Sequence, residues 1–184
     1  MVVPSVLWRR LDAPGHDACV LAQGDAGWQL EGTAVFRHDS VPAQLTYRVM
    51  CDRAWRTLRG QVRGWLGAHA VAFAIARTDR GVWTLNGGAV PGLEHYLDLD
   101  LGFTPATNLL QLRRLALAHG QAAAAPVVWL DVAAGTLTVL PQRYERRGDA
   151  TYWYEAPSVP YAGLLEVTPL GFIRRYPDLW EAEP

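Results

Sequence analysis

The sequence predicts an all-β protein built mainly from antiparallel strands. Short runs of β-branched and aromatic residues dominate the chain of 184 residues, and glycine, proline or aspartate interrupts these runs about every ten residues. Apolar residues at helical spacing are scarce. Half of the residues are hydrophobic and 19% are charged, which is a globular composition, and the length suits one domain over residues 1–184.

Eight strands are predicted in the first half of the chain. Turn residues set their limits, and most connections are short, so strands that follow one another in sequence should pair antiparallel as a meander. These strands are residues 5–11, 17–23, 27–38, 43–52, 57–66, 68–77, 81–87 and 96–101.

Five more strands are predicted in the second half, at residues 126–132, 135–144, 150–156, 163–167 and 172–176. The last of them follows a Thr-Pro-Leu-Gly turn, in which Pro169 occupies a favoured turn position.

The strand at 68–77 suggests a strongly curved sheet. Val71, Phe73 and Ile75 alternate with alanines, so one face of the strand is bulky and the other is small. Alanines that face inward would leave room for a ligand inside a barrel or curved sheet. Tight packing of the alanine face against a helix or a second sheet explains the pattern equally well.

Residues 107–125 contain the one pattern compatible with a helix. Thr107 or Asn108 could cap it, but the leucines that follow recur at mixed spacings and leave helix and strand open. The run Gly-Gln-Ala-Ala-Ala-Ala-Pro at 120–126 predicts a linker or the end of a short helix.

Charge and cysteine content exclude several classes of protein. The net charge of −1 gives no indication of nucleic acid as a partner. Cys19 and Cys51 follow no metal-ligand spacing and are too few for a disulfide scaffold, which predicts buried thiols in a reducing compartment. No run approaches the roughly 18 apolar residues of a membrane span, and the first residues do not resemble a secretory signal. We therefore expect a cytoplasmic protein with no transmembrane segment and no cofactor.

Two aspartates on one predicted strand stand close to an arginine pair. Asp98 and Asp100 are two residues apart, so in a strand their α-carbons would lie about 6.5 to 7 Å apart on one face. Two carboxylates at that distance repel by roughly 2.5 kcal/mol at an effective dielectric constant near 20. If that face is enclosed, Arg113 or Arg114 is the natural compensating charge; if it is exposed, both pairs are simply solvated.

Familiar catalytic signatures are absent from the sequence. It holds no Gly-x-Ser-x-Gly elbow and no glycine-rich phosphate or dinucleotide loop. His95 lies near Glu94 and the two aspartates, but this spacing is too common by chance to predict a metal site. The two aspartates do not straddle a substrate as the carboxylates of a glycosidase do. The many tryptophans and tyrosines suit a core, although such rings also line pockets for sugars and lipid chains.

The segment 97–117 resembles the signature of a bacterial family described as "Putative glycolipid-binding", once a domain of unknown function. Further similarity lies in Asp52 and Trp55, in Asp79, Gly81 and Trp83, in Gln142 and Tyr144, and in the closing segment 170–180. Ala106, Leu109 and Gln111 depart from the usual form, as does the pair His95-Tyr96. Within the signature the matching residues are Asp98, Asp100, Leu101, Thr104, Pro105, Thr107, Asn108, Leu110, Arg113, Arg114 and Leu115.

The resemblance implies a spiral β-roll, a highly curved antiparallel sheet similar to bacterial carriers of lipoprotein acyl chains. It also implies a lipophilic or glycolipid ligand and no established reaction. The departures make the identity of the ligand less transferable than the fold. The ligand-binding residues that it implies are Asp98, Asp100, Thr104, Thr107, Asn108, Arg113, Arg114, Trp55, Trp83 and Tyr144.

Three functions follow from these observations. The leading hypothesis is non-catalytic binding of an amphipathic molecule, with its tail inside the curved sheet and its head near Asp98, Asp100 and the arginine pair. The second is an enzyme that acts on a small amphipathic substrate and uses Asp98 or Asp100 as general base. The third is a structural or interaction protein, for example a homodimer, which a sheet interior without a cavity of a few hundred cubic ångströms would favour.

Overall fold

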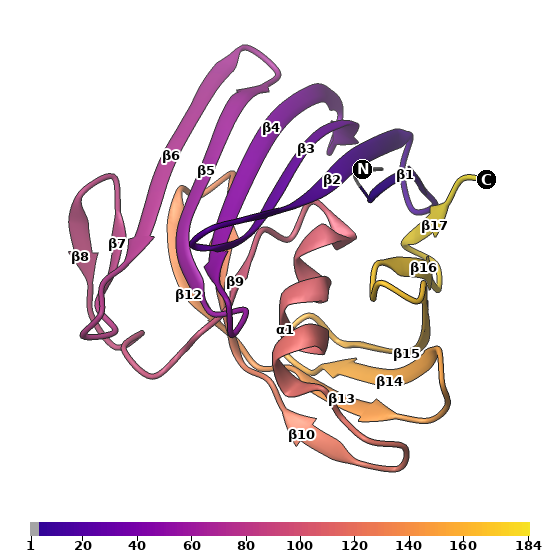
Figure 1. Ribbon diagram of the computed structural model, residues 1–184. Helices are drawn as coiled ribbons and strands as arrows, with labels where there is room; N and C mark the ends of the chain where they lie inside the picture. Colours follow the sequence, from indigo (N-terminus) through magenta and orange to yellow (C-terminus); the bar gives the residue numbers. More distant parts are fainter. Residues whose placement is uncertain (1–3) are drawn as a thin grey trace.

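A computed structural model describes residues 4–184 of the chain as two β-sheets and one α-helix (Figure 1). The larger sheet has 14 strands, and the smaller has three. All strand pairs of the larger sheet are antiparallel. The predicted all-β, mainly antiparallel fold is confirmed.

The elements of the two sheets and the helix have the following bounds. They are β1 (Ser5–Arg10), β2 (Gly15–Gly24), β3 (Gly27–His38), β4 (Val41–Asp52), β5 (Thr57–Leu66), β6 (His69–Arg77), β7 (Trp83–Leu85), β8 (Gly88–Val90), β9 (Leu99–Asp100), α1 (Asn108–Leu115), β10 (Ala122–Ala124), β11 (Val127–Asp131), β12 (Thr136–Leu140), β13 (Arg143–Arg146), β14 (Thr151–Ala156), β15 (Tyr161–Val167), β16 (Ile173–Tyr176) and β17 (Trp180–Ala182).

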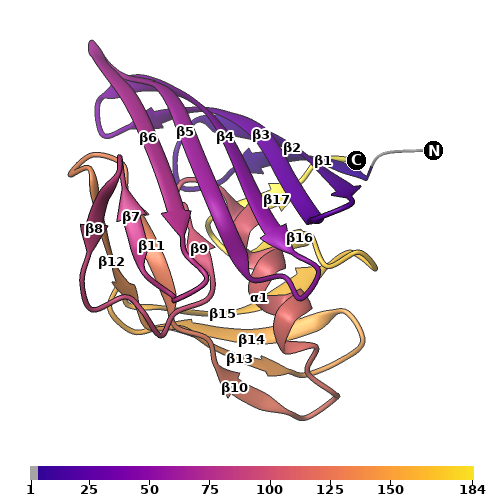
Figure 2. The same ribbon diagram turned by 60° about the vertical axis from the view of Figure 1, so that its left-hand side comes forward.

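Two meanders form the large sheet, and the two ends of the chain join them. Strands β1 to β8 follow one another in order, as do β13 to β17, and β17 pairs antiparallel with β1. Trp8 of β1 strengthens this junction because its indole Nε1 donates to the carbonyl of Ile173 at 2.6 Å. The sheet curls around α1, which lies on its concave side in both views (Figures 1 and 2).

The small sheet has the order β12-β11-β9 and contains a parallel pair, β9 with β11. A parallel pair needs a long crossover connection, and here the crossover consists of a short 3₁₀ turn (Pro105–Thr107), α1 and β10. This connection carries α1 onto the concave side of the large sheet, between its two meanders (Figures 1 and 2).

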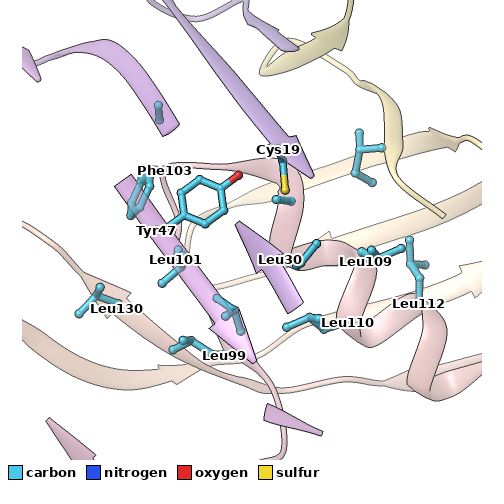
Figure 3. Close-up of a cluster of buried hydrophobic side chains, with 14 of the residues drawn as sticks. Cys19, Leu30, Tyr47, Leu99, Leu101, Phe103, Leu109, Leu110, Leu112 and Leu130 are labelled. Atoms are coloured by element: carbon cyan, nitrogen blue, oxygen red, sulfur yellow. The ribbon is translucent and has the colours of Figure 1, made fainter. Parts of the chain in front are cut away.

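The space on the concave side of the large sheet is filled, which corrects the expectation of a tail cavity there. Leu99, Leu101, Leu109, Leu110 and Leu130 are at most 1% exposed and belong to one hydrophobic cluster with the inward side chains of the sheet (Figure 3). Close packing of this kind leaves no room for a chain of methylenes.

Strand β6 has the opposite orientation to the one that would leave room for a ligand. Val71 and Ile75 are buried and Phe73 is half-buried, whereas Ala70, Ala72 and Ala74 are exposed. The bulky face points inward because it covers the small sheet: a side chain at Gly60, the partner of Ile75 in β5, would collide with Leu99. The alanines therefore line the outer surface.

Several local predictions were wrong where tertiary pairing overrode local preference. Residues 122–124, expected as linker or helix end, form β10 against β13. The predicted strand 135–144 divides at Pro141 into β12 and β13, which belong to different sheets. The predicted strand 96–101 shrinks to β9, with two paired residues. Strands β8 and β17 were not predicted.

The undecided segment from 107 onward begins with a helix. Thr104 starts the preceding 3₁₀ turn, where its hydroxyl accepts a hydrogen bond from the amide of Ala106 at 3.0 Å, and Pro105 suits the first position of such a turn. The helix ends at Leu115, and Ala116, its C-cap residue, has a left-handed φ of 44°. Its last turn carries Arg113 and Arg114, whose charges suit the carbonyl end of a helix.

Candidate functional site

Asp98 forms a buried ion pair with Arg114. The Asp98 carboxylate is fully buried and accepts from Arg114 Nε at 3.0 Å and from Arg114 Nη2 at 2.6 Å. Burial raises the pKa of the Asp98 carboxyl, and the arginine opposes this rise. Residues 113 and 114 lie on a helix, where successive side chains point about 100° apart, so Arg114 reaches Asp98 and Arg113 does not.

Asp100 is compensated by hydrogen bonds and not by an arginine. Its carboxylate accepts from the amide of Gly102 and from Gln142 Nε2, each at 2.8 Å. The Tyr144 hydroxyl donates to Gln142 Oε1 at 3.4 Å and accepts from Asn108 Nδ2 at 2.7 Å. Burial raises the pKa of Asp100. The sequence predicted Arg113 or Arg114 as the compensating charge for an enclosed face; Arg114 has this role for Asp98, whereas the hydrogen bonds to Asp100 come from Gly102 and Gln142.

Thr104 belongs to a second buried polar cluster, which the sequence analysis missed. The hydroxyls of Thr104 and Tyr47 both donate to the Asp17 carboxylate, Tyr47 at 2.9 Å. Asp17 is fully buried, and burial raises its pKa to about 6. The detectable signal was an aspartate on the inward face of β2, in line with the apolar residues Cys19 and Leu21.

This environment makes stability depend on the protonation of Asp17. Below about pH 4 the Asp17 carboxyl is protonated in both the folded and the unfolded protein. Between about pH 4 and 6 only the folded protein holds this proton, so the free energy of unfolding falls as the pH rises. Above about pH 6 the folded protein bears the full cost of a buried charge. Asp17→Asn cannot ionise, so we expect it to avoid this fall in the free energy of unfolding, which amounts to up to about 3 kcal/mol. Urea unfolding at pH 4, 5, 6 and 7.5 measures it, and an unchanged difference between variant and wild type across this range would contradict the prediction.

Thr107 and Trp83 also make internal contacts. The Thr107 hydroxyl accepts from the amide of Leu101 at 3.4 Å. Trp83 is fully buried, and its indole donates to the carbonyl of Tyr96 at 3.1 Å. Most of the predicted ligand-binding residues thus brace the signature segment against the two sheets.

Arg113 differs from its neighbour Arg114 because it has no acidic partner among residues 4–184. Among residues 4–184 it forms no ion pair, and its Nε atom is buried without a hydrogen-bond partner. Its guanidinium carbon lies 5.7 Å from the centre of the Trp55 ring, which stacks on Trp28 at 4.5 Å. The predicted residues Trp55 and Arg113 are therefore brought together.

A groove of about 480 Å³ runs beside the C-terminal half of α1 and includes Arg113. One wall is the helix end, and the other consists of the β13–β14 connection, the end of β15 and the turn before β16. Its lining residues are Leu112, Arg113, Ala116, Leu117, Arg146, Asp149, Ala150, Tyr152, Val167, Thr168, Pro169 and Gly171. The groove thus combines aliphatic and aromatic surface with two arginines.

Two other hollows lie on the outer surface of the large sheet. One, of about 480 Å³, is lined by polar residues of β2 to β5 such as Thr33, Gln61 and Arg63. The other, of about 770 Å³, lies over β1, β2 and the segment before β16. Neither contains a residue of the signature, so the groove beside α1 is the better candidate site.

Residues 4–184 bring together no group of three histidine, cysteine or acidic side chains that could hold a metal ion. None of their helices is long and apolar enough to cross a membrane. Cys19 and Cys51 are buried free thiols, as predicted, and burial raises the pKa of each to about 12, which keeps them protonated.

Comparisons with known proteins agree with the sequence resemblance. A family model described as "Putative glycolipid-binding" matches residues 5–182. The fold is similar to the crystal structure of a DUF1089 family protein from Pseudomonas aeruginosa, with a TM-score of 0.80, 26% sequence identity and 91% of each chain covered. No curated protein matches the sequence.

Proposed function

The chain belongs to the "Putative glycolipid-binding" family, and we propose that it binds a lipophilic or glycolipid-like molecule, without catalysing a reaction, in the groove beside α1. One observation carries this proposal: the groove places two arginines next to the apolar side chains of Leu112, Leu117, Tyr152 and Val167. An apolar wall with a few placed polar groups is the usual design of a small-molecule site.

The size of the groove suits part of an amphipathic molecule. Its volume of about 480 Å³ lies within the range of roughly 300 to 1,000 Å³ found for ligand pockets. Burying a chain contributes about 0.8 kcal/mol per methylene, so eight carbons supply roughly 6 kcal/mol before ordering costs. The tail then determines affinity, and the polar head determines selectivity.

The placement of the aspartates favours binding over the enzyme alternative. A general base must reach a substrate proton, yet Asp98 is fully buried against Arg114, and Asp100 is 7% exposed and bound to Gln142. Neither lines the groove. The filled interior of the large sheet argues against a tail site inside the sheet, and by itself would favour a structural or interaction protein. The groove beside α1, however, supplies a hollow of sufficient volume outside that interior.

Native mass spectrometry tests the proposal. Delipidated protein incubated with a bacterial lipid extract should retain a co-eluting species. A clean apo spectrum across all lipid classes would contradict ligand binding and favour the interaction alternative.

Filling the groove should abolish this retention. Ala150 is exposed and lines the groove, so Ala150→Trp places an indole in the volume that the tail requires. The matched control is Ala162→Trp, because Ala162 is an exposed residue of β15 outside the groove. Equal retention of lipid by both variants would place the site elsewhere.

A further inference from the structure

The two adjacent arginines of α1 have different electrostatic environments. Arg114 is matched by a carboxylate at 2.6 Å. Arg113 has no carboxylate partner among residues 4–184, and its Nε–H makes no hydrogen bond although the atom is buried. A buried donor without a partner costs free energy, and its retention in a folded protein calls for an explanation such as a functional role of the side chain.

The surrounding rings and backbone hold the Arg113 side chain at the groove. The Trp55 ring lies against one side of the guanidinium at 5.7 Å, and Trp28 supports that ring with a nearly parallel stack at 13°. Gly171 lies beside the same side chain: a β-carbon there would stand 2.9 Å from Leu109 Cδ1 and 3.6 Å from Arg113 Nε. The glycine, whose φ is +90°, therefore lets the backbone before β16 pack close to α1 next to Nε.

A second positive charge, Arg146, also lines the groove and has no carboxylate partner among residues 4–184. Arg146 donates to the backbone carbonyls of Leu117, Gly148 and Asp149 at 2.9 to 3.2 Å, and these contacts fix its position but do not neutralise its charge. Its guanidinium carbon lies 6.0 Å from the centre of the Tyr152 ring. The acidic side chain that lines the groove is the exposed Asp149, so the lining has two positive charges and one negative charge.

We infer that the groove binds the anionic head of an amphiphile, a phosphate, sulfate or carboxylate group, between Arg113 and Arg146. This inference rests on the proposed function and names the ligand's charge class. An arginine presents two parallel N–H donors to an oxyanion, a geometry that a neutral sugar hydroxyl does not match. The terminal Nη groups of Arg113, which are not buried with Nε, are the donors that a ligand in the groove can reach. The apolar side chains of Leu112, Leu117 and Val167 then accept the start of the tail.

Three probes of matched design test the inference by isothermal titration calorimetry at pH 7.5. Dodecyl phosphate has the tail and an anionic head, dodecyl maltoside has the same tail and a neutral sugar head, and inorganic phosphate has the head alone. Both amphiphiles are used below their micelle-forming concentrations. We expect wild-type protein to bind dodecyl phosphate about 10- to 100-fold more tightly than dodecyl maltoside.

Arg113→Gln should remove this preference by weakening the binding of dodecyl phosphate about 10- to 100-fold, with a much smaller change in the affinity for dodecyl maltoside. The matched control is Arg147→Gln, because Arg147 is an exposed arginine directly after β13 that pairs with Glu145 and does not line the groove. Thermal unfolding verifies that each variant folds. Arg113→Lys, which retains the charge and loses the paired donors, should show an intermediate preference and serves if Arg113→Gln does not fold.

The outcomes separate the inference from the proposed function. Equal affinity of wild type for both amphiphiles, or an undiminished preference in both Arg113 variants, would overturn the anionic head while leaving amphiphile binding intact. Inorganic phosphate that binds as tightly as dodecyl phosphate, with loss in Arg113→Gln, would support the anion site and overturn the tail. No binding of any probe would overturn both.

Discussion

Replacing Arg114 by glutamine should lower the free energy of unfolding by about 3 to 5 kcal/mol. The Asp98 carboxylate is fully buried, and among residues 4–184 its ion-pair partner is Arg114. Removing the arginine leaves either an uncompensated charge in the interior or a carboxylic acid that must take up a proton. Urea unfolding at pH 7.5, followed by tryptophan fluorescence, measures the loss.

Two controls show whether the loss comes from the unpaired carboxylate. The double variant Asp98→Asn, Arg114→Gln removes both charges and should recover at least half of the lost stability. Arg48→Gln breaks the pair with Glu31, in which both side chains are nearly half exposed, and should have a much smaller effect on stability because water and salt screen an exposed pair. A double variant no more stable than Arg114→Gln would show that the arginine acts mainly through its packing.

Replacing Leu110 by alanine should also cost about 3 to 5 kcal/mol. Leu110 is fully buried on α1, and the cluster in Figure 3 extends from it through Leu99 and Leu101 to Leu130. Truncation removes apolar contacts and leaves a cavity that neighbouring sheet residues cannot fill without distorting their strands. The prediction tests whether α1 forms the centre of the fold, as the filled concave side indicates.

Leu115→Ala is the matched control for this prediction. Leu115 lies on the same helix but is only partly buried against the cluster, so its truncation should cost about 1 kcal/mol. Equal losses for the two variants would indicate that helix stability, and not core packing, determines the effect. A loss below 1 kcal/mol for Leu110→Ala would contradict the packing of α1 in the interior.

The pattern of strands could be predicted because it depends on local periodicity. In β4, for example, buried and exposed residues alternate along almost the whole strand from Ala43 to Cys51, and one such strand already indicates which residues face inward. The same reasoning failed for β10, whose three alanines are in a strand through their pairing with β13. It also failed at Pro141, where one predicted strand divides between two sheets.

The candidate site was predictable in its residues but not in their roles. The signature led to Arg113, which lines the groove, and also to Asp100 and Thr104, which are buried. The role of Asp17 was not predicted, because its partners Tyr47 and Thr104 are 30 and 87 residues away in sequence. Arg146 and Tyr152 of the groove belong to no pattern that the sequence displays, since only the approach of the β13–β14 connection to α1 brings them to the site.

The sequence by itself determined the antiparallel strands, the family signature and the presence of an arginine pair near two aspartates. Only the tertiary structure decided that Arg114 neutralises Asp98 while Arg113 lies unpaired at a groove. The physical reason is that alternation and turn residues act over a few neighbouring positions, whereas the direction of each arginine depends on whether residues 108–115 form a helix. The filling of the concave side, and with it the position of any ligand, depends on contacts between residues far apart in the chain.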